Sequence, residues 1–301
     1  RHLGSQLWNY ARSLWIGRGR EAIWHSTYYT LPKLWDGFQV VTVHGMIHER
    51  FPELYNEPLH DLARQRKRRC VEEANAVICV SETTRQDVHR FYGLDPDTIY
   101  VVPNAYSGVF RRIEQSDDEK DLPTPGPFLL YIGSRAPYKN FRGLIRAYGK
   151  WSGREEVTLV VVGGSWSADE KHQLAKLGLK RCVRLLTGVD DEALCRLYNR
   201  AVALVYPSLH EGFGIPLLEA MACGCPVVAS RIPSTIEVAG QCPIYFEIGN
   251  TLSLLTALDL AVSEGRDSDR VRSGLRRVKP YSWDNTAKQT LEVYRALSKD
   301  E

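Results

Sequence analysis

The stretch from 203 to 230 carries the residue types best suited to chemistry. Glu211 lies in a glycine-bearing loop, and Glu219 follows it by eight residues. An apolar run that ends at Tyr206 precedes the loop, and Pro216 suits the first turn of a following helix. Such a strand–loop–helix unit offers free N–H groups and the positive end of a helix dipole, which favour a phosphate. Either glutamate alone would only complement the dipole, but together with the glycines the pair predicts a ligand site.

A second loop, from 133 to 140, also ends an apolar run and opens a helical pattern. It carries Arg135 and Lys139, four residues apart. Two cations in one loop suit a diphosphate, because arginine binds as a bidentate fork and lysine as a point charge. The alternative is a solvated loop. A third loop with Gly163 and Gly164 allows close backbone approach, which is a weaker signal. Ligands of open α/β sheets bind at the carboxyl edge of the strands, where such loops meet.

Apolar runs alternate with helical patterns along the chain, which predicts an α/β fold with parallel sheets. Most of the runs lack polar alternation, as is typical of strands buried on both faces. The predicted strands are 22–25, 39–44, 76–80, 98–102, 128–132, 157–162, 183–186, 203–206, 226–229 and 244–246. The predicted helices are 57–74, 83–92, 140–151, 168–178, 190–200, 215–223, 251–264, 268–278 and 284–298.

The chain has 301 residues, which suggests two domains at about 150 residues each. A polar stretch over 114–121 is followed by three prolines, which predicts a linker. We therefore expect an N-terminal domain over 1–118, a linker over 119–127, a C-terminal domain over 128–282, and a final helix over 283–301 that crosses back to the first domain.

The composition excludes several classes of protein. With 44% hydrophobic and 25% charged residues the chain can build two cores, so wholesale disorder is excluded. A net charge of +3 argues against nucleic-acid binding. No apolar run approaches the roughly 20 residues of a membrane span. Seven cysteines without a CxxC pair argue for reduced thiols in the cytoplasm and against a zinc site.

One charge run lies in the predicted helix 57–74. It consists of Arg64, Arg66, Lys67, Arg68 and Arg69. Such a run could contact the headgroups of an anionic membrane, which would add a peripheral membrane association to a cytoplasmic location. The alternative is a solvated helix face whose charge is balanced by Glu72 and Glu73.

The segment from Glu211 to Glu219 resembles the paired-glutamate signature of family-four retaining glycosyltransferases. These have the GT-B fold, in which two Rossmann-like domains with parallel sheets face a cleft. Residues 134–140 resemble that family's donor-diphosphate loop, and residues 25–32 and 41–52 are also similar to it. The resemblance covers nearly the whole chain. By comparison with the family, we expect the first domain to be incomplete at its start, without the opening strands of a complete GT-B domain. The sequence also differs from the family at Gly45, where many relatives carry an acid.

The resemblance implies a role for each matched position. Glu219 would bind the ribose of the donor nucleotide, Glu211 would contact the donor sugar, and His44 would lie beside that sugar. Arg135 and Lys139 would neutralise the diphosphate leaving group. With Glu211 and His44 they form the expected catalytic set. The expected donor-binding set also includes Gly133, Gly163, Val189, Gly212, Phe213, Gly214 and Ile215.

The implied activity is the retaining transfer of a hexose from UDP-hexose or GDP-mannose to a glycan or lipid-linked acceptor, as in polysaccharide biosynthesis. We expect no cofactor and no metal. The alternative is a nucleotide-sugar-binding module, or half of a split transferase, without activity of its own. A third hypothesis is a GT-B nucleotide-sugar epimerase or a phosphorylase. A phosphorylase would need a lysine in a pyridoxal-binding context, which the sequence does not show.

Overall fold

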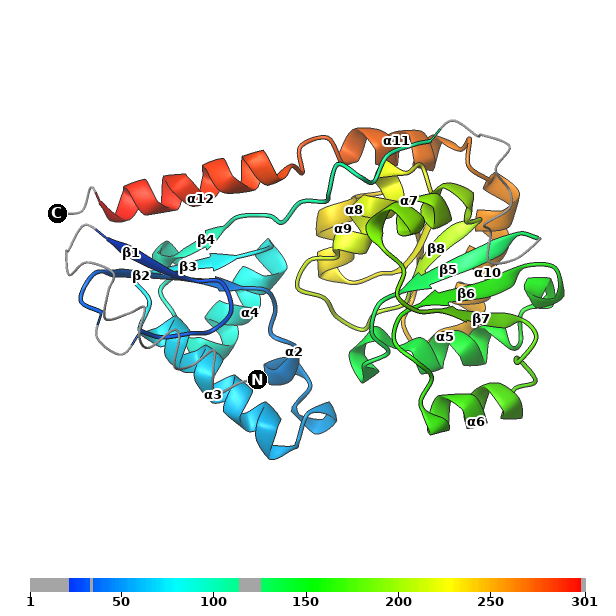
Figure 1. Cartoon of the computed structure of the whole chain (residues 1–301), viewed down its shortest axis with the longest axis horizontal. Coiled ribbons are helices and arrows are strands. Elements are labelled where there is room, and N and C mark those ends of the chain that lie inside the picture. Colours follow the sequence, from blue (N-terminus) through cyan, green and yellow to red (C-terminus); the bar gives the residue numbers. More distant parts are fainter. Residues whose placement is uncertain (1–21, 33–34, 114–125, 299–301) are drawn as a thin grey trace. The chain divides into compact units, whose positions relative to one another are not determined.

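The computed structural model describes residues 22–32, 35–113 and 126–298 (Figure 1). These residues divide into two compact units. The first comprises the described residues up to Asn104 together with those from Asp284 onward, and the second runs from Ala105 to Trp283. The final helix therefore belongs to the first unit by its contacts.

The boundary lies before the predicted end of the first domain at 118. The reason is that residues 105–113 make their contacts within the second unit. The ring of Phe110 contacts the ring of Tyr198 at a centroid distance of 5.8 Å, and the backbone N–H of Ile113 donates to Asn199 Oδ1 at 2.9 Å. Most of the predicted linker 119–127 lies outside the described residues.

The first unit contains a four-stranded parallel sheet in the order β1-β2-β3-β4. Its strands are β1 (Ile23–Ser26), β2 (Phe38–Val43), β3 (Ala76–Cys79) and β4 (Ile99–Val101). Strand β3 is buried along its whole length, as its unbroken apolar sequence predicts. His44 directly follows β2, so it stands at the carboxyl edge of this sheet.

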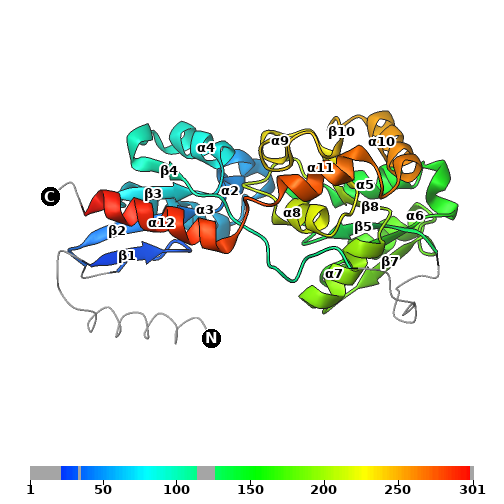
Figure 2. The same cartoon turned by 90° about the horizontal axis from the view of Figure 1, so that it is seen from above.

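Helices cover both faces of the first sheet. Cys70 and Val71 of α3 (Pro58–Glu72) and Val88 of α4 (Glu82–Tyr92) share one apolar cluster with alternate strand residues. Val293 and Leu297 of α12 (Trp283–Leu297) share another with Val40, Ala76 and Ile78. Figures 1 and 2 show α12 running along the sheet on the side away from α3 and α4. Short helix α2 (Ile47–Arg50) follows β2.

The second unit contains a six-stranded parallel sheet in the order β10-β9-β8-β5-β6-β7. Its strands are β5 (Phe128–Ile132), β6 (Thr158–Val162), β7 (Val183–Leu186), β8 (Ala203–Tyr206), β9 (Val227–Ser230) and β10 (Ile244–Phe246). The chain runs from β5 to β7 toward one edge, and then from β8 to β10 toward the other. The strand order therefore reverses between β5 and β8, and a ligand of a doubly wound sheet binds at the carboxyl side of such a switch point.

Two groups of helices enclose the second sheet (Figure 1). Helices α5 (Phe141–Tyr148), α6 (Ala168–Lys176) and α10 (Thr251–Glu264) contribute to one core cluster with the strands. Helices α7 (Asp191–Arg200), α8 (Ile215–Ala222) and α11 (Asp269–Arg277) pack together on the opposite face. Helix α9 (Pro233–Ala239) connects β9 to β10.

The predicted α/β fold with parallel sheets is confirmed. Each predicted strand is present with ends shifted by no more than a residue or so, and each predicted helix is present. The pattern missed α2 and α9, because one or two turns are too short to show a helical period. Within the described ranges no helix has the length and apolar character needed to cross a bilayer.

Candidate active site

Two loops of the second unit meet at the switch point. One follows β5 and the other follows β8, and the backbone N–H of Leu209 donates to the carbonyl oxygen of Tyr138 at 2.7 Å to join them. Next to this link, Lys139 Nζ donates to Glu211 Oε1 at 2.7 Å. Both side chains are largely buried, with 14% and 9% of their surface exposed. The predicted cation and the predicted carboxylate are therefore brought together.

Aromatic rings surround this ion pair. Lys139 Nζ lies 5.2 Å from the ring centroid of Tyr138 and 5.3 Å from that of Tyr206. Full burial, and the charge of Glu211 beside it, raise the pKa of Tyr206 well above its ordinary value. The phenol of Tyr206 therefore stays protonated and can act only as a neutral hydrogen-bonding group beside Glu211.

Helix α8 begins at the same edge, directly after Gly214. This glycine has φ = +114°, and a Cβ there would lie 3.0 Å from Leu217 Cδ1, so any other residue would be strained. No side chain caps the helix. Phe213 is buried against the ring of Tyr281, at a centroid distance of 5.9 Å. The loop Gly212–Gly214 thus leads the backbone into Ile215, the first residue of α8, with the positive end of the helix at the switch point.

Glu219 lies one turn into α8 and contacts α7. The phenol of Tyr198 donates to Glu219 Oε2 at 2.8 Å. The pKa of Glu219 is raised to about 7, chiefly by burial; the hydrogen bond from Tyr198 lowers it, and the charge of Asp191 contributes a smaller part of the rise. Asp190 caps α7 by accepting from the N–H of Ala193 at 2.8 Å.

Arg135 is engaged within the protein. Its Nε donates to Glu170 Oε1 at 2.5 Å, and one terminal nitrogen donates to the carbonyl oxygens of Gly164 and Ser165 at 2.9 and 2.8 Å. Its guanidinium also lies 4.7 Å from the ring centroid of Trp166. Partial burial disfavours ionised Glu170, but hydrogen bonds from Arg135 and Ser167 keep the pKa of this carboxyl below its ordinary value. Arg135 therefore ties the loop after β5 to the loop after β6.

Gly163 is required where these two loops meet. A Cβ at this position would lie 2.7 Å from the carbonyl oxygen of Gly133 and 3.0 Å from Arg135 Nη1. The neighbouring backbone cannot move away cheaply, so only glycine fits. Gly133 itself has φ = +118°. Val189 lies in the next loop along, between β7 and the cap of α7.

His44 belongs to the first unit. It is exposed, and its Nε2 donates to the carbonyl oxygen of Thr27 at 3.0 Å. The next residue, Gly45, is held by Lys67, whose Nζ donates to its carbonyl oxygen at 2.9 Å and to Glu49 Oε2 at 2.8 Å. Tyr92 donates to Glu49 Oε1 at 2.7 Å. A buried ion pair thus supports the loop that carries His44.

The charge run of α3 is largely engaged within its own unit. Lys67 is buried in the pair with Glu49. Arg64 pairs with Asp61 and donates to two backbone carbonyls, while Arg68 pairs with Glu72 and Arg69 with Glu73. The arrangement matches the alternative of a balanced helix face, and Lys67 is not available to a lipid headgroup.

Comparison with known proteins identifies the family. Residues 112–269 match the family described as "Glycosyl transferases group 1", and residues 10–107 match "Glycosyltransferase Family 4". The chain belongs to the glycosyl transferases group 1. It is 30% identical over 95% of its length to O-antigen chain mannosyltransferase B of Escherichia coli, of which it spans 77%.

Solved structures show the same fold at low sequence identity. Sucrose-phosphate synthase from Thermosynechococcus elongatus superposes with a TM-score of 0.78 at 21% identity, over 93% of this chain and 74% of that one. HepE from Anabaena in complex with UDP-glucose gives a TM-score of 0.69 at 18% identity, over 87% and 72% of the two chains. The glycosyltransferase therefore has the GT-B fold that the sequence resemblance implied.

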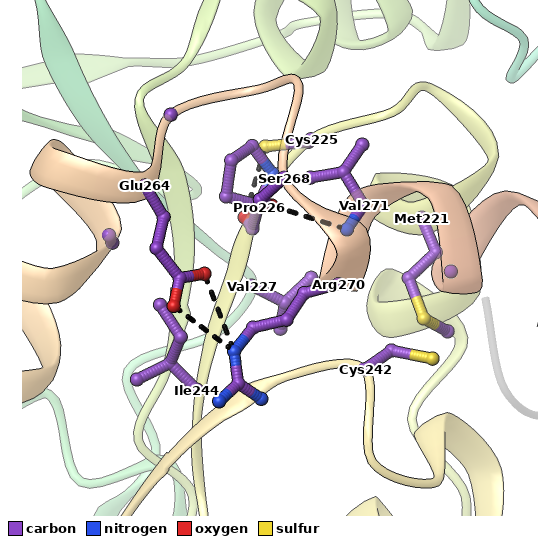
Figure 3. Close-up of a pocket in the computed structure, with 13 residues that line it drawn as sticks. Met221, Cys225, Pro226, Val227, Cys242, Ile244, Glu264, Ser268, Arg270 and Val271 are labelled. Carbon is purple, nitrogen blue, oxygen red and sulfur yellow. Dashed lines mark hydrogen bonds and ion pairs between the residues drawn. The ribbon is translucent and has the colours of Figure 1, made fainter.

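The pocket in Figure 3 lies elsewhere in the glycosyltransferase. Pro226, Val227 and Ile244 line it where β9 and β10 begin, and Glu264 and Arg270 form an ion pair beside it. It is therefore at the amino edge of the sheet, opposite the carboxyl edge where the loops meet. Its volume of about 10 Å³ holds one water molecule at most, so it does not fit a sugar nucleotide.

Sequence reasoning missed three residues that shape the site. Glu170 had a signal, because Ser167 and Glu170 form the capping box that opens α6. Tyr206 was predicted only as the end of a strand. Tyr198 had no signal, since its partner Glu219 lies on a different helix. In the part of the chain that the structure describes, no group of three or more His, Cys, Asp or Glu residues could hold a metal ion.

Proposed function

We propose that this glycosyltransferase transfers a hexose, with retention at the anomeric carbon, from a nucleotide diphospho-sugar to a glycan or lipid-linked acceptor. The observation that carries the proposal is the Lys139–Glu211 pair at the switch point, beside the open start of α8. Glu219, on the same helix, is assigned to the ribose of the donor, as the family resemblance implies. The reaction belongs to polysaccharide biosynthesis, as the name of the mannosyltransferase relative also suggests.

Charge stabilisation is the main chemical task in this reaction. Breaking the glycosyl–diphosphate bond leaves negative charge on the diphosphate and an oxocarbenium-like sugar. In the proposal, Lys139 Nζ turns from Glu211 to the leaving diphosphate, and the N-terminus of α8 adds its partial positive charge. Glu211 is then released to accept hydrogen bonds from hydroxyls of the donor sugar. Lys139 and Glu211 thus give up their contact with each other, and each binds a different part of the same substrate.

Retention follows from attack on the face that the diphosphate leaves. The acceptor hydroxyl forms the new bond to the anomeric carbon as the bond to the diphosphate oxygen breaks. The leaving diphosphate takes the proton of that hydroxyl, so the proposal needs no protein base, metal or cofactor. His44, exposed at the carboxyl edge of the first sheet, is assigned to the donor sugar, as the family resemblance implies.

Arg135 serves the diphosphate differently from Lys139 in this proposal. Its bonds to Glu170 and to the carbonyls of Gly164 and Ser165 fix the glycine loop that approaches the phosphates. Its charge also adds positive potential, which Glu170 reduces. We propose UDP-hexose and GDP-mannose as candidate donors, in keeping with the relative named as a mannosyltransferase and with the HepE complex with UDP-glucose.

The proposal is tested by donor cleavage with water as the acceptor. The enzyme is incubated with GDP-mannose or UDP-glucose in the presence of EDTA, and the released nucleoside diphosphate is measured by ³¹P NMR. The anomer of the released sugar is read by ¹H NMR before it equilibrates. We expect one donor to be cleaved with the donor's own anomeric configuration in the product. Inversion, or a requirement for added metal, would contradict the mechanism; tight binding without any cleavage would favour the binding-module alternative.

A further inference from the structure

A buried phenol of α7 has no part in the chemistry described so far. We propose that Tyr198 is a positioning residue: its hydroxyl holds the carboxylate of Glu219 in a single, ionised state that accepts hydrogen bonds from the donor ribose. This inference rests on the proposed function, because it requires a nucleotide at the switch point. It adds a residue that neither the family signature nor the sequence pattern pointed to.

The geometry leaves Tyr198 little freedom. Its side chain is fully buried, and its hydroxyl lies 2.8 Å from Glu219 Oε2 and 3.4 Å from the carbonyl oxygen of Pro216. The ring meets Phe110 edge-on at 5.8 Å. The backbone of the same residue is also fixed, since its carbonyl oxygen accepts from Arg266 Nη1 at 3.0 Å. Because both the ring and the backbone of Tyr198 are held in place, its hydroxyl favours one orientation of the Glu219 carboxylate.

The other titratable and charged groups around Glu219 and Tyr198 do not supply this hydrogen bond. Asp191 of α7 is an anion and disfavours a second negative charge. Arg266 directs its guanidinium to the carbonyl oxygens of Tyr198, Ala201 and Cys223. Burial raises the pKa of the Cys223 and Cys225 thiols, so both are neutral near pH 7. Burial, followed by the charge of Glu219, likewise raises the pKa of Tyr198, which therefore remains a neutral donor.

This arrangement gives donor binding a defined pH dependence. The pKa of Glu219 is raised to about 7, chiefly by burial, even though the hydrogen bond from the Tyr198 hydroxyl lowers it. An ionised carboxylate accepts from ribose hydroxyls with both oxygens, whereas the protonated form loses acceptor capacity. Affinity should therefore fall as the pH drops through about 7. Without the Tyr198 hydroxyl the midpoint should move upward, because the ionised form loses a charge-assisted hydrogen bond.

The experiment measures the dissociation constants of UDP and GDP from pH 5.5 to 9.5 by calorimetry. For Tyr198→Phe we expect the midpoint of the nucleotide that binds to rise by about one pH unit, so that binding near pH 7 weakens several-fold and recovers at about pH 9. Loss of binding through general structural damage would not be reversed by alkaline pH. An unchanged midpoint in Tyr198→Phe would overturn the inference while leaving the proposed function intact.

Two controls isolate the contact. Tyr148 is also a fully buried tyrosine of this unit, and its hydroxyl donates to the carbonyl oxygens of Val157 and Cys182 at 2.7 and 3.0 Å. Tyr148→Phe removes a similar hydrogen bond at a position far along the chain from Glu219. We expect nucleotide binding to this variant to have the same pH midpoint as binding to the unchanged protein. The 2′,3′-dideoxy nucleoside diphosphate has the same titrating phosphate but no ribose hydroxyls. We therefore expect the pH dependence of its binding to have the same midpoint in Tyr198→Phe as in the unchanged protein.

A measurement without nucleotide separates the two claims. The carboxyl carbon of Glu219 is followed by ¹³C NMR against pH, and its signal is assigned by its loss in Glu219→Gln. We expect its midpoint to rise in Tyr198→Phe and not in Tyr148→Phe; equal midpoints in both would contradict the inference. If the unchanged protein binds neither UDP nor GDP at any pH, the proposed function fails, and the ribose role of Tyr198 fails with it.

Discussion

Two lysine–glutamate pairs, one in each unit, have nearly the same geometry and different surroundings. Lys67 and Glu49 lie 2.8 Å apart with 5% and 7% of their side chains exposed, and Lys139 and Glu211 lie 2.7 Å apart with 14% and 9% exposed. The first pair is closed by further hydrogen bonds to the carbonyl oxygen of Gly45 and from the phenol of Tyr92. The second lies where two glycine-bearing loops meet beside a helix start.

The difference shows that the distance within a buried ion pair does not reveal its role. A pair whose remaining donors and acceptors are filled by the protein fixes the local backbone. A pair that stands at the carboxyl edge of a switch point can exchange partners with an anionic substrate. We therefore propose that Lys67–Glu49 supports the backbone of the His44 loop, whereas Lys139–Glu211 binds the substrate.

The largest effect should come from breaking the architectural pair. Lys67→Met leaves Glu49 buried without its cation, and removal of one partner of a buried pair typically costs about 3–5 kcal/mol of stability. We expect the urea unfolding transition of the first unit to move to lower denaturant by a corresponding amount. A loss below about 1 kcal/mol, the range typical of exposed pairs, would show that the pair is not structural.

Breaking the second pair should act on the reaction. Lys139→Ala removes the cation assigned to the leaving diphosphate, and loss of one such preorganised contact costs about 2.7–4 kcal/mol of barrier. We expect turnover in donor cleavage to fall by about 100-fold or more. Two matched double variants compare the pairs directly, because each removes one whole ion pair. Turnover should be abolished in Lys139→Met/Glu211→Gln but not in Lys67→Met/Glu49→Gln. Equal activity of the two double variants would contradict the assignment.

We expect the buried carboxylate of Glu219 to lower the stability of the folded protein when it is ionised. Its pKa of about 7 in the folded protein is higher than in an unfolded chain, so this group binds more protons when folded. Its contribution to stability is therefore lost as the pH rises from about 4.5 to 7 and stays absent above 7. At pH 8, Glu219→Gln should stabilise the protein by on the order of 2–3 kcal/mol while it loses nucleotide binding. A less stable variant in thermal unfolding would reverse the predicted sign.

The smallest effect is expected at an exposed ion pair between α5 and α6. Arg142 pairs with Asp169 at 2.7 Å, with 65% and 55% of the side chains exposed. Arg142→Ala should change stability by less than about 1 kcal/mol and leave turnover unaltered. Arg135→Ala, in contrast, should lower turnover by about 100-fold, because the glycine loop loses its anchor. Similar turnover in the two variants would remove Arg135 from the site.

The sequence predicted the strands and the long helices because apolar periodicity is a local property. Glu211, Lys139 and the glycines were placed together correctly in one region, since their loops follow neighbouring parallel strands. Partners distant in sequence were not predictable. Lys67 was grouped with a surface charge run, although Glu49 draws it inward, and Arg135 was expected to be free for phosphate, although Glu170 engages it. The periodicity of apolar residues does not depend on which residue of another helix or strand a side chain contacts, so it cannot predict such partners.

The most direct test of the central claim is a thermal-shift panel with UDP, GDP and ADP. A ligand at 100 times its dissociation constant adds about 2.7 kcal/mol of stability, which corresponds to a shift of several degrees for a unit of this size. We expect one nucleotide to raise the unfolding temperature. This shift should be lost in Glu219→Ala and in Lys139→Ala, but kept in Lys67→Met, whose unfolding temperature without ligand is lower. A shift that survives in Glu219→Ala, or no shift with any nucleotide, would contradict the assignment of the switch point as the donor site.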